Sequence, residues 1–496
     1  MPTPAGPPRP FPAPADGLRE PWADQPHPGG RRRRRALAAV GALLVVAALG
    51  GGAFTARQLA GRPDRQAVAI QTGSGRQPAP AGAATRPAAP LGPRLLAVTS
   101  HPAGATLTIE AAGGSTRRVR TPFRGMVPGG ELALSLTRPG YNRLDHHLLL
   151  DRARTLEFWL DPAGLLHHDL GSFSTGSNPK QVAFTPDSRQ IWVTLLGGHG
   201  VQVFSAGTRR LLHQIRLGQH GAVEVIFTKD GHTAYASQME TASVFEIDTA
   251  TYKVRRQLAT KGNWSKVMAL SPDERSLYVA NWSSNDVSEI DLASGRVRRR
   301  MPTVATPRGL YPTPDGKRLY VAGFDGGDLA RIDLASGRTK DLLHTGGAMR
   351  HLVGDPQRGL LYADDMAKGQ AWVVDLASER VRRLAATDHV PNTMDLSPDG
   401  RVLYVSNRGR NGASYYVPGP EWGSVLAIDA RTGRPLDAIV GGNQTTGLDV
   451  SPDGRLLAFS DFLDNRVRLF AVPPYDRLAA GHGGRTAAHR AELAKR

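Results

Sequence analysis

Short apolar runs separated by turn signals recur at a nearly constant interval between residues 165 and 474. Measured at its last residue, the turn tag that marks each interval recurs at spacings of 43, 43, 42, 42, 42 and 54 residues. Internal periods of this size are typical of repeat architectures, in which each period is one supersecondary unit. The seven copies of the tag are Thr185-Pro186-Asp187, Thr228-Lys229-Asp230, Ser271-Pro272-Asp273, Thr313-Pro314-Asp315, the degenerate Asp355-Pro356-Gln357, Ser397-Pro398-Asp399 and Ser451-Pro452-Asp453.

Each period holds four runs of strand length, and none has the 3.6-residue period of a helix. One run, such as Leu277–Asn281 or Leu403–Asn407, follows the tag, and a later run ends in a tight turn such as Ile290–Gly295. A single four-stranded sheet cannot bury both of its faces, whereas sheets stacked side by side in a ring can. The pattern therefore predicts an all-β fold in which residues 165–474 form a seven-bladed β-propeller.

The way in which the ring closes can also be predicted. Only two runs, Leu456–Ser460 and Val467–Val472, follow the seventh tag, so the last blade lacks its outer strand. The segment Leu165–Phe173 precedes the first tag and has no blade of its own. We expect this segment to pair with the last blade, which closes the ring without exposed sheet edges. The long spacing of 54 residues contains 12 extra residues, which we place within Arg408–Trp422 as an aromatic and polar loop of the sixth blade.

Two motifs carry a family resemblance. Tyr278-Val279-Ala280-Asn281 and Tyr404-Val405-Ser406-Asn407, together with the S-P-D-G and I-D-x-x-S-G turns, resemble the YVTN family of β-propellers. The resemblance implies an extracytoplasmic binding or surface protein, and some relatives in that family are parts of redox enzymes. It specifies the fold far better than the function, because one fold hosts many activities.

Residues 94–161 form a second all-β unit with alternating runs, which predict a small β-sandwich. The order of its motifs resembles a PEGA domain, although the turn ahead of Thr121, at Gly113–Arg120, departs from the PEGA pattern. The resemblance implies an accessory module of the cell envelope, and a generic spacer sandwich remains open. The motifs are Ser100-His101-Pro102-Ala103-Gly104-Ala105, Thr121-Pro122, Val127-Pro128-Gly129 and Arg138-Pro139-Gly140-Tyr141.

The N-terminal part of the chain predicts a membrane anchor. Residues 1–35 are rich in Pro and end in five consecutive arginines, and the uncharged residues 36–56 follow. A helix of that length spans a bilayer, and the arginines orient residues 1–35 toward the cytoplasm. A cleaved signal peptide or a twin-arginine signal remains open as an alternative. Residues 57–93 read as a linker, and residues 475–496 as a basic tail, either a short helix or disordered.

Composition narrows the classes of function. The net charge is +18, of which +8 falls in residues 1–90 and +4 in residues 477–496. The remaining +6 is modest for the folded region, so we expect no nucleic-acid partner. The chain has no Cys, which excludes disulfides, thiolate metal sites and a cysteine nucleophile. We identify no catalytic residue, no metal ligands and no cofactor motif, since H-E-x-x-H, G-x-S-x-G and Walker A patterns are all lacking.

Equivalent positions in the innermost strands suggest a binding site. Seven residues before the end of each tag stand Lys180, Val223, Lys266, Arg308, Arg350, Asn392 and Thr446, four of them cationic. We expect these residues to ring one mouth of the central channel and to create a positive potential there. Trp264 precedes an inner strand, and Trp282, Asn407 and Arg408 stand at the ends of second strands on the same face. The hypothesis is an anion- or glycan-binding mouth with arginine contacts and aromatic stacking, against the alternative of ordinary solvated loop charge.

The recurrent aspartates of the tags and of the second turn class are expected to be structural, because a carboxylate there caps backbone N–H groups. The sequence as a whole favours a single-pass membrane protein, outside the cytoplasm in bulk, that binds an envelope protein or polysaccharide. The alternative is a propeller enzyme, either a lactonase-like hydrolase or a subunit of a periplasmic oxidoreductase. Asp365, Asp461, Asp395 and Asp449 could then converge in the channel.

Overall fold

The computed structural model describes residues 92–495. The predicted cytoplasmic tail, the predicted anchor at 36–56 and nearly all of the predicted linker lie outside these residues. Along residues 92–495, neither of the helices has the length and apolar character needed to cross a bilayer.

The first described unit is a small two-sheet sandwich. Its strands are β1 (Arg94–His101), β2 (Thr106–Ala111), β3 (Thr116–Arg120), β4 (Phe123–Val127), β5 (Gly130–Thr137), β6 (Leu144–Leu150) and β7 (Arg154–Trp159). One sheet has the order β4-β1-β7 and the other the order β3-β2-β5-β6. Alternate residues of facing strands, such as Leu96, Val98, Leu107 and Leu134, are buried in a common core. The alternating runs of the sequence coincide with five of these strands, whereas the exposed arginines of β3 and β4 obscured the other two.

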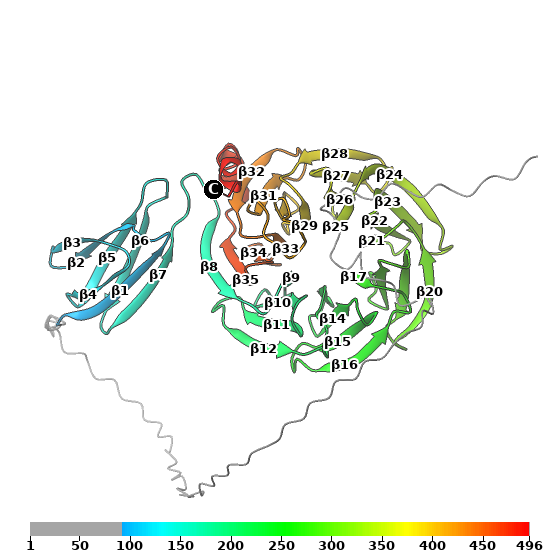
Figure 1. Cartoon of the computed structure of the whole chain (residues 1–496), viewed down its shortest axis with the longest axis horizontal. Coiled ribbons are helices and arrows are strands. Elements are labelled where there is room, and N and C mark those ends of the chain that lie inside the picture. Colours follow the sequence, from blue (N-terminus) through cyan, green and yellow to red (C-terminus); the bar gives the residue numbers. More distant parts are fainter. Residues whose placement is uncertain (1–91, 496) are drawn as a thin grey trace, which may run out of the picture. The chain divides into compact units, whose positions relative to one another are not determined.

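The rest of the described chain is a ring of four-stranded antiparallel sheets (Figure 1). The first three sheets are β9 (Pro179–Phe184), β10 (Gln190–Leu195), β11 (Gly200–Ser205) and β12 (Leu211–Ile215); β13 (Val225–Phe227), β14 (Thr233–Gln238), β15 (Ser243–Asp248) and β16 (Val254–Ala259); and β17 (Ser265–Leu270), β18 (Ser276–Asn281), β19 (Asp286–Asp291) and β20 (Arg296–Pro302). The next three are β21 (Pro307–Pro312), β22 (Arg318–Gly323), β23 (Gly326–Asp333) and β24 (Thr339–Gly347); β25 (Met349–Asp355), β26 (Leu360–Asp365), β27 (Gln370–Asp375) and β28 (Val381–Ala386); and β29 (Pro391–Leu396), β30 (Val402–Asn407), β31 (Ser424–Asp429) and β32 (Pro435–Val440). The last is β33 (Thr445–Val450), β34 (Leu456–Asp461), β35 (Arg466–Ala471) and β8 (His168–Ser174).

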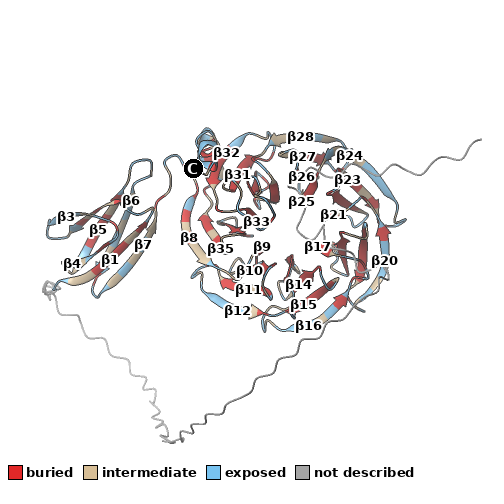
Figure 2. Ribbon diagram, in the orientation of Figure 1, coloured by how far each residue is buried: buried red, intermediate tan, exposed pale blue. Residues whose placement is uncertain are grey.

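Within each sheet the first strand faces the centre of the ring and the last strand faces outward (Figure 1). Neighbouring inner strands contact one another, including β33 with β9, so the sheets bury their faces against each other. Figure 2 shows the consequence, because buried residues fill the inner strands and exposed residues line outer strands such as β12 and β16. The predicted all-β repeat with four strands per period is confirmed.

The last sheet closes the ring with a strand from the start of the repeat region. β8 pairs with β35 in an antiparallel ladder that runs from Ser174 opposite Arg466 to His168 opposite Ala471. The predicted pairing of this upstream segment with the last sheet is therefore confirmed. It covers the edge of β35, which would otherwise offer unpaired backbone groups to another chain.

Residues after the ring are ordered rather than a free tail. Two short helices, α1 (Tyr475–Ala480) and α2 (His489–Leu493), pack against β32. His489 is buried, and its Nε2 lies 2.7 Å from the Asp388 carboxylate. Of the two interpretations that the sequence left open for this segment, the structure shows short helices, and they pack on the sixth sheet.

Candidate functional site

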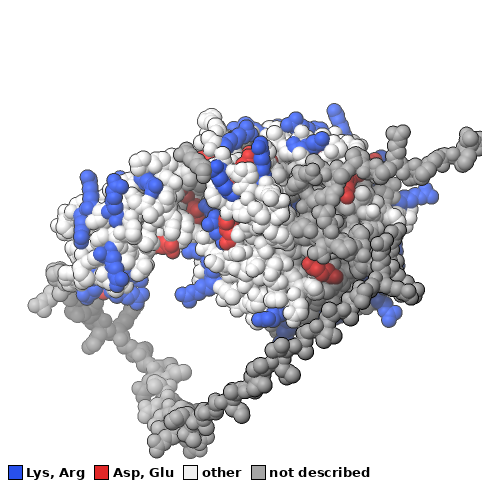
Figure 3. All heavy atoms as spheres, in the orientation of Figure 1, with Lys and Arg blue, Asp and Glu red and all other residues white. Residues whose placement is uncertain are grey.

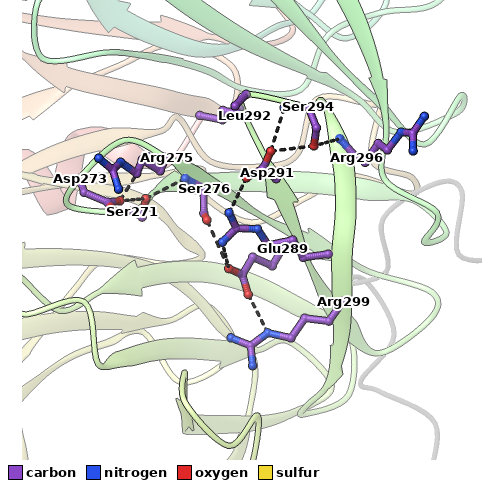
Figure 4. Close-up of polar contacts among 12 residues, drawn as sticks. Ser271, Asp273, Arg275, Ser276, Glu289, Asp291, Leu292, Ser294, Arg296 and Arg299 are labelled. Atoms are coloured by element: carbon purple, nitrogen blue, oxygen red, sulfur yellow. Dashed lines mark hydrogen bonds and ion pairs between the residues drawn. The ribbon is translucent and has the colours of Figure 1, made fainter.

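The turn tags are structural, as expected. In the third sheet Asp273 accepts hydrogen bonds from the Ser271 hydroxyl at 2.6 Å and from the Arg275 N–H at 3.2 Å (Figure 4). These bonds lower the pKa of Asp273, although burial acts weakly against them. In the second turn class Asp291 accepts from the hydroxyl and the N–H of Ser294, and its pKa falls to about 2. Both carboxylates therefore hold strand connections together and stay ionised at neutral pH.

The predicted cations lie at equivalent places in the inner strands. Lys180, Lys266, Arg308 and Arg350 are the second residues of β9, β17, β21 and β25, and Asn392 is the second residue of β29. None of these side chains is more than 5% exposed. The prediction that they line an exposed mouth is wrong, because other side chains cover them and they lie within the ring.

A collar of apolar residues covers these second residues of the inner strands. The residue directly after the second strand is apolar in six sheets, and the collar consists of Leu196, Met239, Trp282, Phe324, Met366 and Phe462. They form two packed clusters, one around Phe462 and one around Trp282, and Trp264 packs against both. Because these residues stand at equivalent positions of six sheets arranged in a ring, their side chains meet near the centre of the ring. This explains why they cluster.

The two tryptophans predicted as stacking platforms belong to this collar. Trp282 is buried, and its ring packs against Phe324 and lies 3.5 Å from Lys266 Nζ. Trp264 is half-buried between the two clusters. The predicted stacking of a glycan on Trp282 is therefore wrong, since its faces are already taken by protein groups.

Asn407 and Arg408 shape the loop that follows them. Asn407 Nδ2 donates to the Ser424 hydroxyl at 3.3 Å, across the base of the loop. The Arg408 guanidinium takes the collar position of the sixth sheet, lies 4.0 Å from the Tyr415 ring and donates to Gln444. Both side chains are buried, so their predicted role in contacting a ligand at the mouth is wrong for the structure as it stands.

The extra residues of the sixth sheet lie where the spacing placed them, between β30 and β31. Tyr415 is buried, packs edge-on against Phe462 and accepts a hydrogen bond from Lys180 Nζ at 2.5 Å. The next two residues are partly exposed, with Tyr416 44% and Val417 43% exposed, and the Tyr416 ring stacks on Phe462. The loop thus has an aromatic anchor inside the ring and an apolar tip outside it.

Below the collar, a cavity of about 30 Å³ lies at the centre of the ring. Three predicted cations reach it, namely Lys180, Arg308 and Arg350. The structure therefore brings together part of the predicted set, while Lys266 turns toward Trp282. The remaining lining residues are Gln181, Val223, Glu224, Val267, His351 and Thr393.

Two titratable groups of the cavity have strongly shifted pKa values. Burial raises the pKa of Glu224 to about 7, although Arg308 and Arg350 act in the opposite direction, as does the Met268 N–H, which donates to Glu224 at 2.5 Å. Burial, reinforced by the charges of Arg350 and Arg308, lowers the pKa of His351 to about 3. The His351 ring is therefore neutral, and its Nδ1 accepts a hydrogen bond from the Met394 N–H at 3.3 Å.

The four aspartates considered for the channel divide into two kinds. Asp365 accepts a hydrogen bond from Thr345 of β24, and Asp461 accepts one from Thr445 of β33, so both carboxylates hold strand ends in place. Asp395 and Asp449 lie on the neighbouring inner strands β29 and β33, where burial raises both pKa values and each carboxyl interacts with the other. In residues 92–495, no group of three or more His, Asp or Glu side chains is arranged to hold a metal ion.

Comparison with known proteins agrees with this geometry. Residues 233–434 match the YNCE-like beta-propeller family. Antigen Lp49 of Leptospira interrogans is 33% identical over 354 residues, which cover 68% of this chain and 77% of that protein. The chain belongs to the YNCE-like β-propeller family. Hydrazine synthase of Kuenenia stuttgartiensis has a similar structure, with a TM-score of 0.53 over 60% of this chain and 97% of that one, and at 19% identity the likeness concerns the fold alone.

In this YNCE-like propeller, sequence reasoning missed the acidic and neutral side chains that lie near the cations in the cavity. Glu224 and His351 stand one residue after the positions that we aligned, and Asp364 stands near the end of a second strand. Burial raises the pKa of Asp364 to about 6, and its Oδ1 accepts from the His351 N–H at 2.6 Å. An alignment of the repeats extended by one residue would have revealed Glu224 and His351.

Proposed function

We propose that this protein is an extracytoplasmic binding protein that holds a partner protein against the collar face of its propeller. In this proposal residues 36–56 anchor it in the membrane with residues 1–35 in the cytoplasm. A PEGA-like sandwich at 94–161 and a seven-bladed propeller at 165–474 then lie outside the cytoplasm. The YVTN-type repeats support this location, as does the name of the relative, antigen Lp49.

The observation that carries the proposal is the construction of the loop between β30 and β31. Loops on a rigid scaffold commonly carry binding residues. Here Tyr415 fixes the loop from below, while Tyr416 and Val417 present an apolar tip beside the exposed Arg410. Aromatic and arginine side chains are frequent anchors of protein interfaces. We expect the partner to offer an apolar patch flanked by carboxylates.

An anionic envelope polymer is a second candidate ligand. The central cations are buried, so a polymer could not reach them from the collar face. Exposed Lys and Arg side chains are nevertheless more frequent than Asp and Glu on the face drawn in Figure 3. The edge strand β3 of the sandwich adds the exposed Arg118 and Arg120, which favour contact with a polyanion.

A matched pair of variants tests the docking surface. Val417→Asp places a charge on the loop tip, whereas Leu212→Asp places one on the outer strand β12, where Leu212 is exposed to a similar extent. The full chain is used to capture partners from solubilised envelopes, and the captured protein is then purified and titrated against each variant. We expect at least tenfold weaker binding for Val417→Asp and wild-type binding for Leu212→Asp. Equal binding by both variants would exclude the loop as the docking site.

A further inference from the structure

The central cavity has the size of a single small ion. Its volume is about 30 Å³, whereas one water molecule needs about 10–15 Å³ of such space. It therefore accommodates about two waters or one monatomic ion. A sulfate or phosphate group, with four oxygens around its central atom, is too large. Val223 and Val267 make part of the wall apolar, which disfavours a strongly hydrated ion.

One hydrogen-bond donor of the cavity lacks an acceptor. Arg308 is 5% exposed and lines the cavity, and among residues 92–495 its buried Nη1 has no hydrogen-bond partner. A guanidinium stays charged at every physiological pH, so it cannot relieve its burial by losing a proton. Buried charges in proteins are usually paired or hydrogen-bonded. The unsatisfied donor of Arg308 therefore indicates that something accepts its hydrogen bond.

The charges around the cavity indicate that this acceptor carries a negative charge. Lys180 and Arg350 reach the same cavity from β9 and β25, so cations come from three separate sheets. The acidic group of the lining, Glu224, has a pKa of about 7 and is only partly ionised at neutral pH. His351 is neutral there. The lining therefore has an excess of positive charge.

We propose that the central cavity binds one halide ion, chloride under physiological conditions, with Arg308 as its main hydrogen-bond donor. The ion lies where β9, β21 and β25 converge and offsets the repulsion between their cations. It stabilises the ring from the inside. Lys180 contacts both the cavity and the loop anchor Tyr415, but Arg308 and the exposed loop tip at Val417 do not share a contact, so variants at these two residues distinguish the two proposals.

Thermal unfolding of the full chain in halide and in halide-free buffer of equal ionic strength tests the site. If the ion binds only the folded protein, a chloride concentration 100 times Kd raises Tm by about 4 °C for a ring of this size. We expect chloride and bromide to raise Tm in a saturable way. Arg308→Met keeps a long side chain without the charge and should lose this response. Arg296→Met, at an exposed arginine of β20, is the matched control and should keep it.

Arg308→Met should fold. In halide-free buffer the wild type carries the uncompensated Arg308 charge and the variant does not, so the variant should be at least as stable as the wild type. A full halide response in Arg308→Met, or none in the wild type, would overturn the proposal. Crystals of the wild-type protein grown in bromide give an independent readout. Anomalous density within hydrogen-bond distance of Arg308 Nη1 supports the site, and bromide found only on the protein surface rejects it.

Discussion

The buried Glu224 carboxyl should make the propeller less stable as pH rises. In the folded protein its pKa lies at about 7, above the ordinary value of 4.5, because burial disfavours the charged form. A carboxyl with a raised pKa contributes its full stability below about pH 4.5. That contribution is lost progressively as pH rises toward 7, since the unfolded chain ionises first.

The size of the effect follows from the displacement of the pKa. A shift of one pKa unit corresponds to about 1.4 kcal/mol, so ionised Glu224 lowers the free energy of unfolding by about 3 kcal/mol above pH 7. Glu224→Gln removes the charge and keeps an oxygen that can accept the Met268 N–H. We therefore expect this variant to exceed the wild type by less than about 1 kcal/mol at pH 5 and by about 3 kcal/mol at pH 8.

Urea unfolding followed by tryptophan fluorescence at pH 5, 6, 7 and 8 measures the difference. Asp364 has a raised pKa and contributes to the pH dependence of both proteins, so the comparison of Glu224→Gln with the wild type isolates Glu224. Asp341→Asn, at an exposed carboxylate of β24, is the matched control and should leave the pH profile unchanged. A destabilisation of Glu224→Gln that is the same at every pH would refute the reasoning, because it would mean that the carboxylate is a favourable partner of Arg308 and Arg350.

Two further predictions concern the closure of the ring. Asp437→Asn should lower the free energy of unfolding by about 3 kcal/mol at pH 7 in urea titrations, because the buried Asp437 carboxylate accepts from His167 Nδ1 at 2.8 Å and from three backbone N–H groups. Burial acts to raise the pKa of Asp437, but the His167 contact and the backbone N–H groups together lower it below its ordinary value, so this stability should persist above pH 4 and fall only in more acidic solution. Replacing β8 by a flexible Gly/Ser segment of equal length should leave β35 as an open edge, with faster proteolysis of the last sheet and concentration-dependent association in light scattering. Unchanged proteolysis would show that β8 is dispensable for closure.

The ring itself could be predicted from sequence because its determinants are local and repeated. The tag turn needs a hydroxyl and a carboxylate two residues apart, as in Ser271 and Asp273. This pair can be recognised in the sequence without any knowledge of the tertiary structure. Seven copies at a regular spacing then leave few arrangements of the strands. The pairing of β8 with β35 followed from counting runs, which is also a property of the chain alone.

The candidate site could be predicted only in part, because its environment depends on contacts between sheets. The repeat alignment identified Lys180, Arg308 and Arg350 as equivalent residues of the inner strands, and the structure brings them to one buried cavity rather than to the predicted exposed mouth. It could not show the collar above them, since the depth at which Trp282 and Phe462 pack depends on how closely seven sheets approach one another. The spacing located the extra loop of the sixth sheet, but not the inward turn of Tyr415.

The C-terminal residues also hold the proposed docking loop between β30 and β31 in place. Trp422, at the end of that loop, donates its N–H to the Leu493 carbonyl at 2.8 Å, and the Lys495 N–H donates to the Pro420 carbonyl at 2.9 Å. Tyr415 holds the same loop from inside the ring through Lys180. A loop fixed on both sides loses little conformational entropy when a partner binds, and such preorganisation strengthens binding. Leu493 of α2 and Lys495 after it therefore stabilise the proposed docking loop, while the two helices cover β32.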